Sequence, residues 1–274
     1  MLDLLIAHYK EPDEWVKRLL DTISSQYNNE INVYIANDGD EFIISEELLK
    51  SYSFKINYTI YERCGISKLR NLLIRNSNDK YFWFMDSDDY FIDNSINQLL
   101  ENLDQNYDLL CCGARWEKSD GTTYDYYSGF HQYTIVGCQI LKREWFIKNN
   151  LWVDETEFIS GDISLEILPK YYTDNKKSLS FVGFHYSYNK NSLTRTYDDW
   201  AKSRTKILEN VVKRLLNDEK YNQAYTEYFH AVTMLGLYKE LNIDANIFKD
   251  KLNKTICADS NLKLILDYLK SKLE

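Results

Sequence analysis

Proline, cysteine pairs and long hydrophobic runs are what this sequence has least of. Its 274 residues include only 2 Pro, which excludes long proline-rich linkers. The 5 Cys contain no C-x-x-C pair, so zinc spacing is absent and buried thiols in a reducing compartment are favoured over a disulfide framework. No apolar run approaches the length of a membrane span, and the N-terminal segment lacks the basic start of a signal peptide. We therefore expect a cytoplasmic protein without a transmembrane segment.

Basic residues are also in deficit. The chain has 33 Lys and Arg against 42 Asp and Glu, a formal net charge of −9. Because nucleic-acid binding depends on basic patches that neutralise phosphates, we expect no nucleic-acid partner. The hydrophobic fraction of 44% and the charged fraction of 27% are ordinary for a globular protein. The length allows one large domain, or one domain with a smaller appendage.

Strand-like and helix-like segments alternate over the first hundred residues. This alternation predicts an α/β fold with a mostly parallel central sheet flanked by helices. The expected strands are 2–7, 31–36, 54–61 and 81–85, and the expected helices are 12–26 and 66–76.

The remaining chain changes character twice. Its middle part predicts strands at 107–112 and 179–188, a loop-rich hairpin at 116–130, and short helices at 142–149 and 162–172. From residue 198 onward the apolar residues follow helical spacing, at 204–216, 221–241 and 261–273. We therefore expect one domain over residues 1–197 and a C-terminal helical appendage over 198–274. A homodimer through this tail stays open, as does peripheral membrane contact through its interleaved Lys and Leu residues.

The most informative stretch is Tyr81–Asp89, an apolar run that ends in three carboxylates within four residues. In open α/β sheets, ligands bind at the carboxyl ends of the strands. Clustered carboxylates repel one another, and a divalent cation removes that repulsion. The stretch therefore predicts a site for Mn²⁺ or Mg²⁺, which carboxylates and substrate phosphates hold together. The alternative is helix capping, since a lone Asp-x-Asp also occurs by chance.

Four strand ends carry polar residues that would meet at one rim of a parallel sheet. They are residues 7–11, 37–40, 65–71 and 86–89. Together they offer an aromatic face, a carboxylate, an arginine and a metal site. Such a set can stack a base, hydrogen-bond its edge, pair with a phosphate and chelate a cation.

These segments resemble the motifs of family 2 glycosyltransferases, which have the GT-A fold with its Rossmann-like sheet. The family strings are Pro-Val-Tyr-Asn-x-Glu, Val-Asp-Asp-Gly-Ser, Gly-x-x-x-Ala-Arg-Asn and Leu-Asp-Ser-Asp-Asp. Here they stand, in the same order and at similar spacing, as residues 7–11, 36–40, 65–71 and 85–89. Gly161-Asp162 falls where the family carries Glu-Asp. The resemblance covers roughly residues 1–196 and omits the helical tail.

The resemblance implies a role for each matched residue. Tyr9 would stack on uracil, and Asp38 would accept a hydrogen bond from its ring, with Asn37 nearby. Arg70 would contact the nucleotide, and Asp162 would be the general base that takes a proton from the acceptor hydroxyl. The remaining matched residues are Ala7, Glu11 and Ser87 in the nucleotide-sugar site, Asp86 at the ribose or the metal, and Asp88 at the metal.

His185 is left between two interpretations. It lies on a late strand, from which it would reach the metal as late histidines do in some GT-A enzymes. It would equally suit a satisfied histidine of the core. We include it among the candidate metal ligands with Asp86 and Asp88.

The resemblance implies a metal-dependent inverting glycosyltransferase. The enzyme would move a hexosyl or N-acetylhexosaminyl group from a UDP-sugar to a hydroxyl of a glycan, a lipid-linked acceptor or a protein. Ala7 and Asn37 depart from the family's Pro and Asp, but neither change removes the expected base or metal ligand. One alternative is a non-catalytic scaffold that binds nucleotide sugars. A sugar nucleotidyltransferase is less favoured, because it would want a glycine-rich loop after the first strand.

Overall fold

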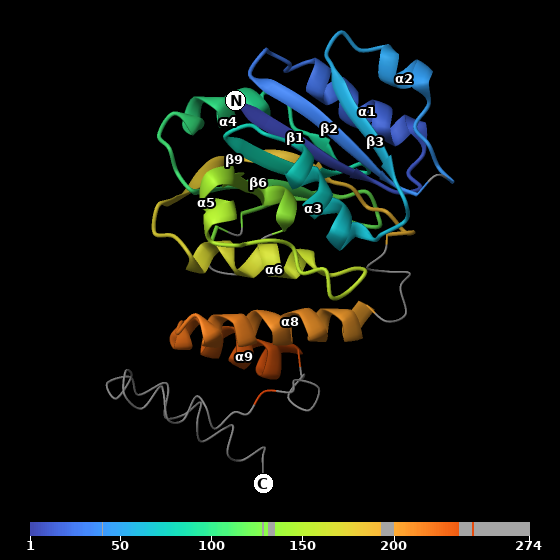
Figure 1. Ribbon diagram of the computed structural model, residues 1–274. Coiled ribbons are helices and arrows are strands. Elements are labelled where there is room, and N and C mark those ends of the chain that lie inside the picture. Colours follow the sequence, from blue (N-terminus) through green and yellow to red (C-terminus); the bar gives the residue numbers. More distant parts are fainter. Residues whose placement is uncertain (40, 128, 131–134, 193–199, 236–242, 244–274) are drawn as a thin grey trace. The chain divides into compact units, whose positions relative to one another are not determined.

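The computed structural model describes residues 1–39, 41–127, 129–130, 135–192, 200–235 and 243 (Figure 1). The chain divides into two compact units, Met1–Ile207 and Leu208–Glu274. The domain boundary expected at 197/198 stays a prediction. The expected helix at 261–273 and the end of the one at 221–241 lie outside the described residues.

The first part of unit one is a parallel half-sheet in the order β3-β2-β1-β4. Leu4 pairs with both Val33 and Trp83, so β1 is central. Each parallel connection carries a helix, as βαβ geometry requires. The elements are β1 (Leu2–His8), α1 (Asp13–Ser24), β2 (Ile31–Asp38), α2 (Glu46–Lys50), β3 (Ile56–Tyr61), α3 (Ile66–Asn76) and β4 (Tyr81–Asp86).

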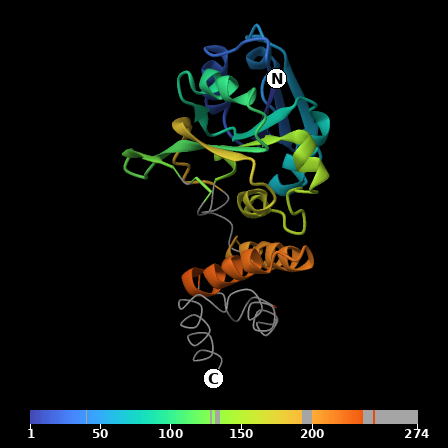
Figure 2. The same ribbon diagram turned by 90° about the vertical axis from the view of Figure 1, so that its left-hand side faces the viewer.

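The second part extends the same sheet with mixed pairing. β8 joins antiparallel to both β4 and β6, and β9 runs parallel to β6. The short β5 pairs antiparallel with β9, and the short β7 pairs antiparallel with β6. The β6–β7 hairpin projects from this unit (Figure 2). The strands are β5 (Tyr90–Phe91), β6 (Leu109–Glu117), β7 (Thr123–Tyr126), β8 (Gln139–Lys142) and β9 (Lys176–Tyr186).

Helices complete both units. In unit one they are α4 (Ser95–Leu103), α5 (Arg143–Lys148), α6 (Asp162–Ile167) and the 3-10 turns Val136–Cys138 and Pro169–Tyr171. The C-terminal helices are α8 (Trp200–Asn217) and α9 (Tyr221–Leu235). The expected fold class, a mostly parallel α/β sheet flanked by helices with a helical appendage, is confirmed. Among the described residues, none of the helices has the length and apolar character needed to span a bilayer.

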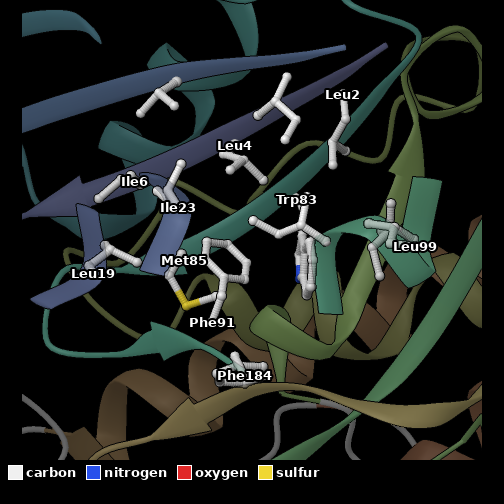
Figure 3. Packing of buried hydrophobic residues seen from close by; sticks show 14 of the residues in the cluster. Leu2, Leu4, Ile6, Leu19, Ile23, Trp83, Met85, Phe91, Leu99 and Phe184 are labelled. Carbon is white, nitrogen blue, oxygen red and sulfur yellow. The ribbon is translucent and has the colours of Figure 1, made fainter. Parts of the chain in front are cut away.

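The core is continuous across the two parts of the sheet. Leu4 of β1 and Ile23 of α1 are fully buried beside Trp83 of β4 (Figure 3). The Trp83 ring contacts Phe91 with centroids 4.8 Å apart, and its Nε1 donates to the Gly137 carbonyl at 2.6 Å. Burying side chains of this size stabilises the fold by roughly 1.5–3 kcal/mol each. The core therefore fixes the strands whose carboxyl ends carry the polar segments.

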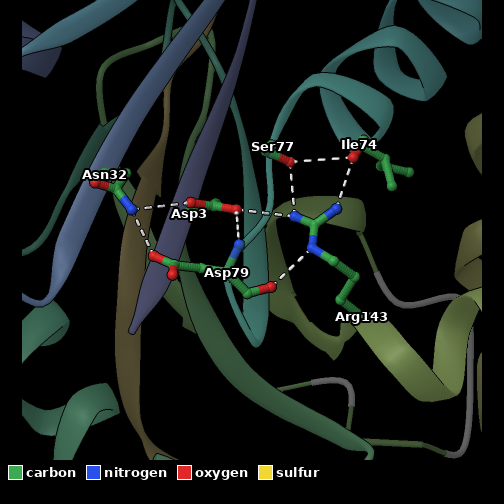
Figure 4. A network of polar contacts seen from close by, with 6 residues as sticks. All are labelled: Asp3, Asn32, Ile74, Ser77, Asp79 and Arg143. Atoms are coloured by element: carbon green, nitrogen blue, oxygen red, sulfur yellow. Dashed lines mark hydrogen bonds and ion pairs between the residues drawn. The ribbon is translucent and has the colours of Figure 1, made fainter.

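A buried ion-pair network fixes the opposite, amino end of the strands (Figure 4). Arg143 Nη2 lies 2.9 Å from Asp3 Oδ2 and 2.6 Å from Ser77 Oγ, and its Nε donates to the Asp79 carbonyl at 2.7 Å. The Ile74 carbonyl accepts from Nη1 at 2.6 Å. Arg143 thus ties the start of β1 to the end of α3 and the start of β4.

Candidate active site

A cavity of about 760 Å³ opens at the carboxyl ends of the first strands. Its size is that of a small-molecule or cofactor site. It is lined by nine of the predicted site residues, namely Ala7, Tyr9, Glu11, Asp38, Arg70, Asp86, Ser87, Asp88 and Asp162. Asn37 lines a neighbouring cavity of about 410 Å³, which shares Tyr9, Asp38 and Arg63 with the larger one. His185 lines neither.

The loop after β1 is held against the acidic turn after β4. Glu11 Oε2 accepts from the Tyr9 backbone N–H at 2.7 Å and from Ser87 Oγ at 2.8 Å. His8 Nδ1 lies 3.0 Å from the same hydroxyl. Burial and the nearby Asp88 raise the pKa of Glu11 to about 7, and burial lowers the pKa of His8 to about 4. His8 is therefore neutral at pH 7. Glu11 accepts hydrogen bonds from both the loop and the acidic turn, and so holds the two together.

Asp38 organises the turn before α3. Its Oδ1 accepts from the Cys64 N–H at 2.6 Å, and its Oδ2 accepts from the Gly65 N–H at 3.1 Å. Gly65 has φ +83°, and a Cβ there would come within 2.5 Å of the Phe158 carbonyl oxygen, so a glycine is required. Asn37 is 2% exposed, and its Oδ1 has no hydrogen-bond partner within the described part of the chain.

Arg70 bridges two carboxylates that face the cavity. Its Nη2 lies 2.9 Å from Asp86 Oδ1, and its Nη1 lies 3.2 Å from Asp162 Oδ2. The Arg70 side chain is only 5% exposed, whereas Asp86 and Asp162 are 43% and 31% exposed. Burial alone would lower the pKa of Arg70, but the two carboxylates outweigh it and raise it. A charged arginine thus joins the end of β4 to the start of α6.

The acidic turn is anchored on one side and strained by charge on the other. Asp88 Oδ2 accepts from Asn189 Nδ2 at 2.9 Å, and Asp89 Oδ1 accepts from the Ser187 N–H at 2.8 Å. Burial and the neighbouring Asp86 raise the pKa of Asp88 to about 6. The pKa of Asp89 is also raised well above its usual value, by burial and by Asp88.

The donor set of this turn fits a hard divalent cation. Asp86 and Asp88 offer only carboxylate oxygens, the ligands that Mg²⁺ and Mn²⁺ prefer, and their mutual repulsion would fall on binding. Within the residues described, no three His, Cys, Asp or Glu side chains already form a metal-ligand cluster. A cation held here would therefore need further oxygens, such as those of a bound diphosphate.

His185 is directed elsewhere. Its Nε2 lies 3.2 Å from Glu117 Oε2, and its ring stacks on Tyr90 with centroids 4.5 Å apart. The structure thus does not bring His185 to the cavity with Asp88. As a metal ligand it stays a prediction.

Two cavity residues, Arg63 and Glu166, were missed by the sequence analysis. Arg63 lies with its guanidinium 3.7 Å from the centre of the Tyr9 ring. Glu166 lies one helical turn after Asp162, and burial and Asp162 raise its pKa. Trp116, from the hairpin region expected at 116–130, also lines the cavity and contacts Tyr186 with ring centroids 4.4 Å apart. The position of Arg63, two residues before the glycine of the third matched string, is a signal that could have found it.

A mostly parallel α/β sheet with an acidic turn and a nucleotide-sized cavity at its carboxyl rim defines the GT-A class of glycosyltransferase fold. The family model described as glycosyl transferase family 2 matches residues 3–171, more than half of the chain, so the protein belongs to this family.

Solved structures agree with this assignment. The 1–349 fragment of S. aureus TarS, in a crystal structure in complex with UDP-GlcNAc, is similar with a TM-score of 0.72 and 13% identity. The similarity covers 92% of this chain and 78% of that one. At this level of identity it shows the fold alone, and that fold is GT-A.

Curated relatives are similar over shorter stretches. An uncharacterized glycosyltransferase of Rickettsia bellii is 32% identical over 94 residues, which are 34% of this chain and 14% of that protein. A teichoic acid poly(glycerol phosphate) polymerase of Staphylococcus epidermidis is 26% identical over 110 residues, which are 39% of this chain and 15% of that protein. The aligned stretches are thus a minor part of these longer relatives.

Proposed function

We propose that the protein is a metal-dependent, inverting glycosyltransferase that transfers a sugar from a UDP-sugar to an acceptor hydroxyl. The observation that carries the proposal is the pair of half-exposed carboxylates, Asp86 and Asp162, which face one cavity from two elements and are joined by Arg70. One carboxylate belongs to the acidic turn, where a donor diphosphate would lie. The other, Asp162, keeps 31% of its side chain exposed, so an acceptor could reach it.

The donor is assigned to the nucleotide-binding half of the cavity. Tyr9 offers a ring for base stacking, Asp38 lines both cavities with it, and Asn37 lines the smaller one. Ala7, Glu11 and Ser87 shape the loop around it. TarS, which shares the fold, binds UDP-GlcNAc. UDP-sugars are therefore the donors to test first, with hexosyl and N-acetylhexosaminyl groups as candidates.

The metal would be Mn²⁺ or Mg²⁺, held by Asp88 and Asp86. When bound, such a cation supplies positive charge to the departing diphosphate. The raised pKa of Asp88 supports this role, because it reflects burial and repulsion from Asp86, and a bound cation would reduce that repulsion.

Asp162 would act as the general base. Its carboxylate would take the proton of the acceptor hydroxyl as that oxygen bonds to the anomeric carbon. The bond from that carbon to the diphosphate breaks in the same displacement, UDP leaves with the electron pair, and the configuration inverts. A positioned base contributes about 10²- to 10⁴-fold in rate. The acceptor would be a glycan, a lipid-linked sugar or a protein hydroxyl, and the helical tail is proposed as a dimer surface.

Release of UDP from a set of donors tests the proposal. The purified protein is incubated with Mn²⁺ and UDP-glucose, UDP-galactose, UDP-GlcNAc or UDP-GalNAc, with water or a mixed glycan fraction as acceptor. We expect metal-dependent UDP release from one of them. Binding of UDP without any release would favour the scaffold alternative instead.

A further inference from the structure

Among the described residues, four cationic side chains line the cavity. They differ in whether a carboxylate of the protein already lies near the positive charge. Arg70 has its guanidinium between Asp86 and Asp162. Arg204 lies beside the carboxyl of Glu166 and has contacts of its own. Lys10 lies 4.0 Å from Glu41, with both side chains well exposed. Arg63 has no carboxylate partner among the described residues. Its charge is therefore available to a ligand.

Arg63 is also placed where a nucleotide base would enter. Its guanidinium lies 3.7 Å from the centre of the Tyr9 ring, which is stacking distance, and 5.2 Å from the ring of Phe158. Lys10 is farther from the Tyr9 ring, at 5.0 Å. Arg63 lines both cavities, so it stands at their junction beside Asp38. A flat base that stacks on the face of Tyr9 covered by Arg63 would have to enter between the ring and the guanidinium, or displace the guanidinium.

Arginine suits this place because its planar cation stacks on flat π-systems and keeps its donors free at the edge. Arg63 is exposed and belongs to the turn before α3, so its side chain can move without disturbing the core. Arg70 lacks that freedom, because its buried guanidinium would lose its ion pairs with both Asp86 and Asp162 if the side chain moved.

We propose that Arg63, and not the buried Arg70, is the arginine that binds the donor nucleotide, closing over the base that stacks on Tyr9. Arg70 is then a positioning residue, which holds Asp162 in register with Asp86. This inference rests on the proposed function, since it assigns the donor's base to the Tyr9 side of the cavity.

The test measures nucleotide affinity in variants of the full chain. Titration calorimetry with UDP and Mn²⁺ compares the wild type with Arg63→Ala and with the matched control Arg75→Ala, an exposed arginine that lies over the Trp152 ring and lines neither cavity. Uridine is measured as a competitor of UDP. We expect Arg63→Ala to weaken UDP and uridine by the same factor, about tenfold. Arg75→Ala should stay within about twofold of the wild type.

Arg70→Lys provides the contrast. A lysine keeps the charge but cannot bridge two carboxylates with one fork. We expect UDP affinity within about threefold of the wild type and a much larger loss in turnover of the donor, about 10²-fold. Thermal unfolding checks that the variant is folded, and the Arg63 result stands by itself if it is not.

Three results would overturn the inference. The first is UDP affinity in Arg63→Ala within twofold of the wild type, and the second is a loss seen with UDP and absent with uridine. The third is a tenfold loss of UDP affinity in folded Arg70→Lys. If the wild type itself binds no UDP, the proposed function fails rather than the choice between the two arginines.

Discussion

Two arginine–carboxylate clusters lie at opposite ends of the same parallel strands, and they differ in how much of their carboxylates is exposed. At the amino end, Arg143 meets acceptors only from the protein, and its partner Asp3 is 0% exposed. At the carboxyl end, the Arg70 side chain is 5% exposed, but its partners Asp86 and Asp162 keep 43% and 31% of their side chains exposed. An arginine–carboxylate cluster is thus enclosed at the amino end, whereas the cluster at the carboxyl end leaves carboxylate oxygens open to the cavity.

The difference follows from where each cluster sits. The amino end of the sheet closes over its ion pair with the end of α3 and the start of α5. The carboxyl end must stay open, because that is where ligands of open α/β sheets bind. Variants of the two clusters should therefore fail in different ways.

The largest effect is expected from Asp162→Asn. The amide keeps the shape of the side chain but removes the basic oxygen, so sugar transfer should fall by about 10²- to 10⁴-fold. UDP affinity should stay close to that of the wild type, since the change lies on the acceptor side. UDP release, followed with the donor found active, measures the rate. Transfer at the wild-type rate would show that Asp162 is not the base.

Arg143→Met should lower the free energy of unfolding and leave nucleotide binding by the folded protein unchanged. Removing one partner leaves Asp3 charged and buried, which costs about 3–5 kcal/mol in the free energy of unfolding. Urea unfolding measures it, and the UDP affinity of the folded protein should not change. Arg115→Ala is the matched control, because Arg115 and Asp125 are 40% and 38% exposed and such pairs contribute about 0–1 kcal/mol. Equal losses from the two variants would contradict the comparison.

Asp88→Ala should remove the metal dependence of nucleotide binding. The variant keeps Tyr9 and Asp38, so weak UDP binding remains, but Mn²⁺ should no longer strengthen it. Calorimetry with and without the metal gives the ratio of affinities. A ratio equal to that of the wild type would move the metal site away from Asp88.

The smallest effect expected is a pH dependence of metal affinity. Asp88 must lose its proton to bind a cation, and its pKa is raised to about 6. Affinity for Mn²⁺ in the presence of UDP should therefore rise with pH, by up to about tenfold per unit, and level off above pH 6. In the absence of metal, the pH dependence of the stability of the fold has the opposite sign. The folded state holds this proton more tightly than the unfolded chain, so stability falls as pH rises from about 4 through 6. Flat metal affinity between pH 5 and 7 would contradict this.

The elements that the sequence predicted best are those with a strong local pattern. The helix at 66–76 was predicted to the residue, and β1, β2 and β4 were found within two residues, since each is an apolar run between turn residues. The helix expected at 162–172 ends as an α-helix at Ile167, because Pro169 has no N–H to donate and the chain tightens into a 3-10 turn.

The second half of the sheet was harder to predict. β8 has four residues and exists because it bridges β4 and β6, which come from distant parts of the chain. β5 has two residues and depends on β9. The site shows the same limit. Strand ends predicted which residues gather at the rim, but side-chain partners, such as Arg63 on Tyr9 or Glu117 beside His185, arise only from tertiary packing.

Thermal unfolding of the wild type with UDP, with and without Mn²⁺, tests the central claim most directly, with GDP and CDP as comparisons. A ligand at a hundred times its dissociation constant stabilises by about 2.7 kcal/mol, which is visible as a shift of the midpoint. A glycosyltransferase that uses a UDP-sugar and a divalent cation should show a shift with UDP that requires Mn²⁺ and is smaller with the other nucleotides. No shift with any nucleotide, or a UDP shift that is unchanged without metal, would contradict it.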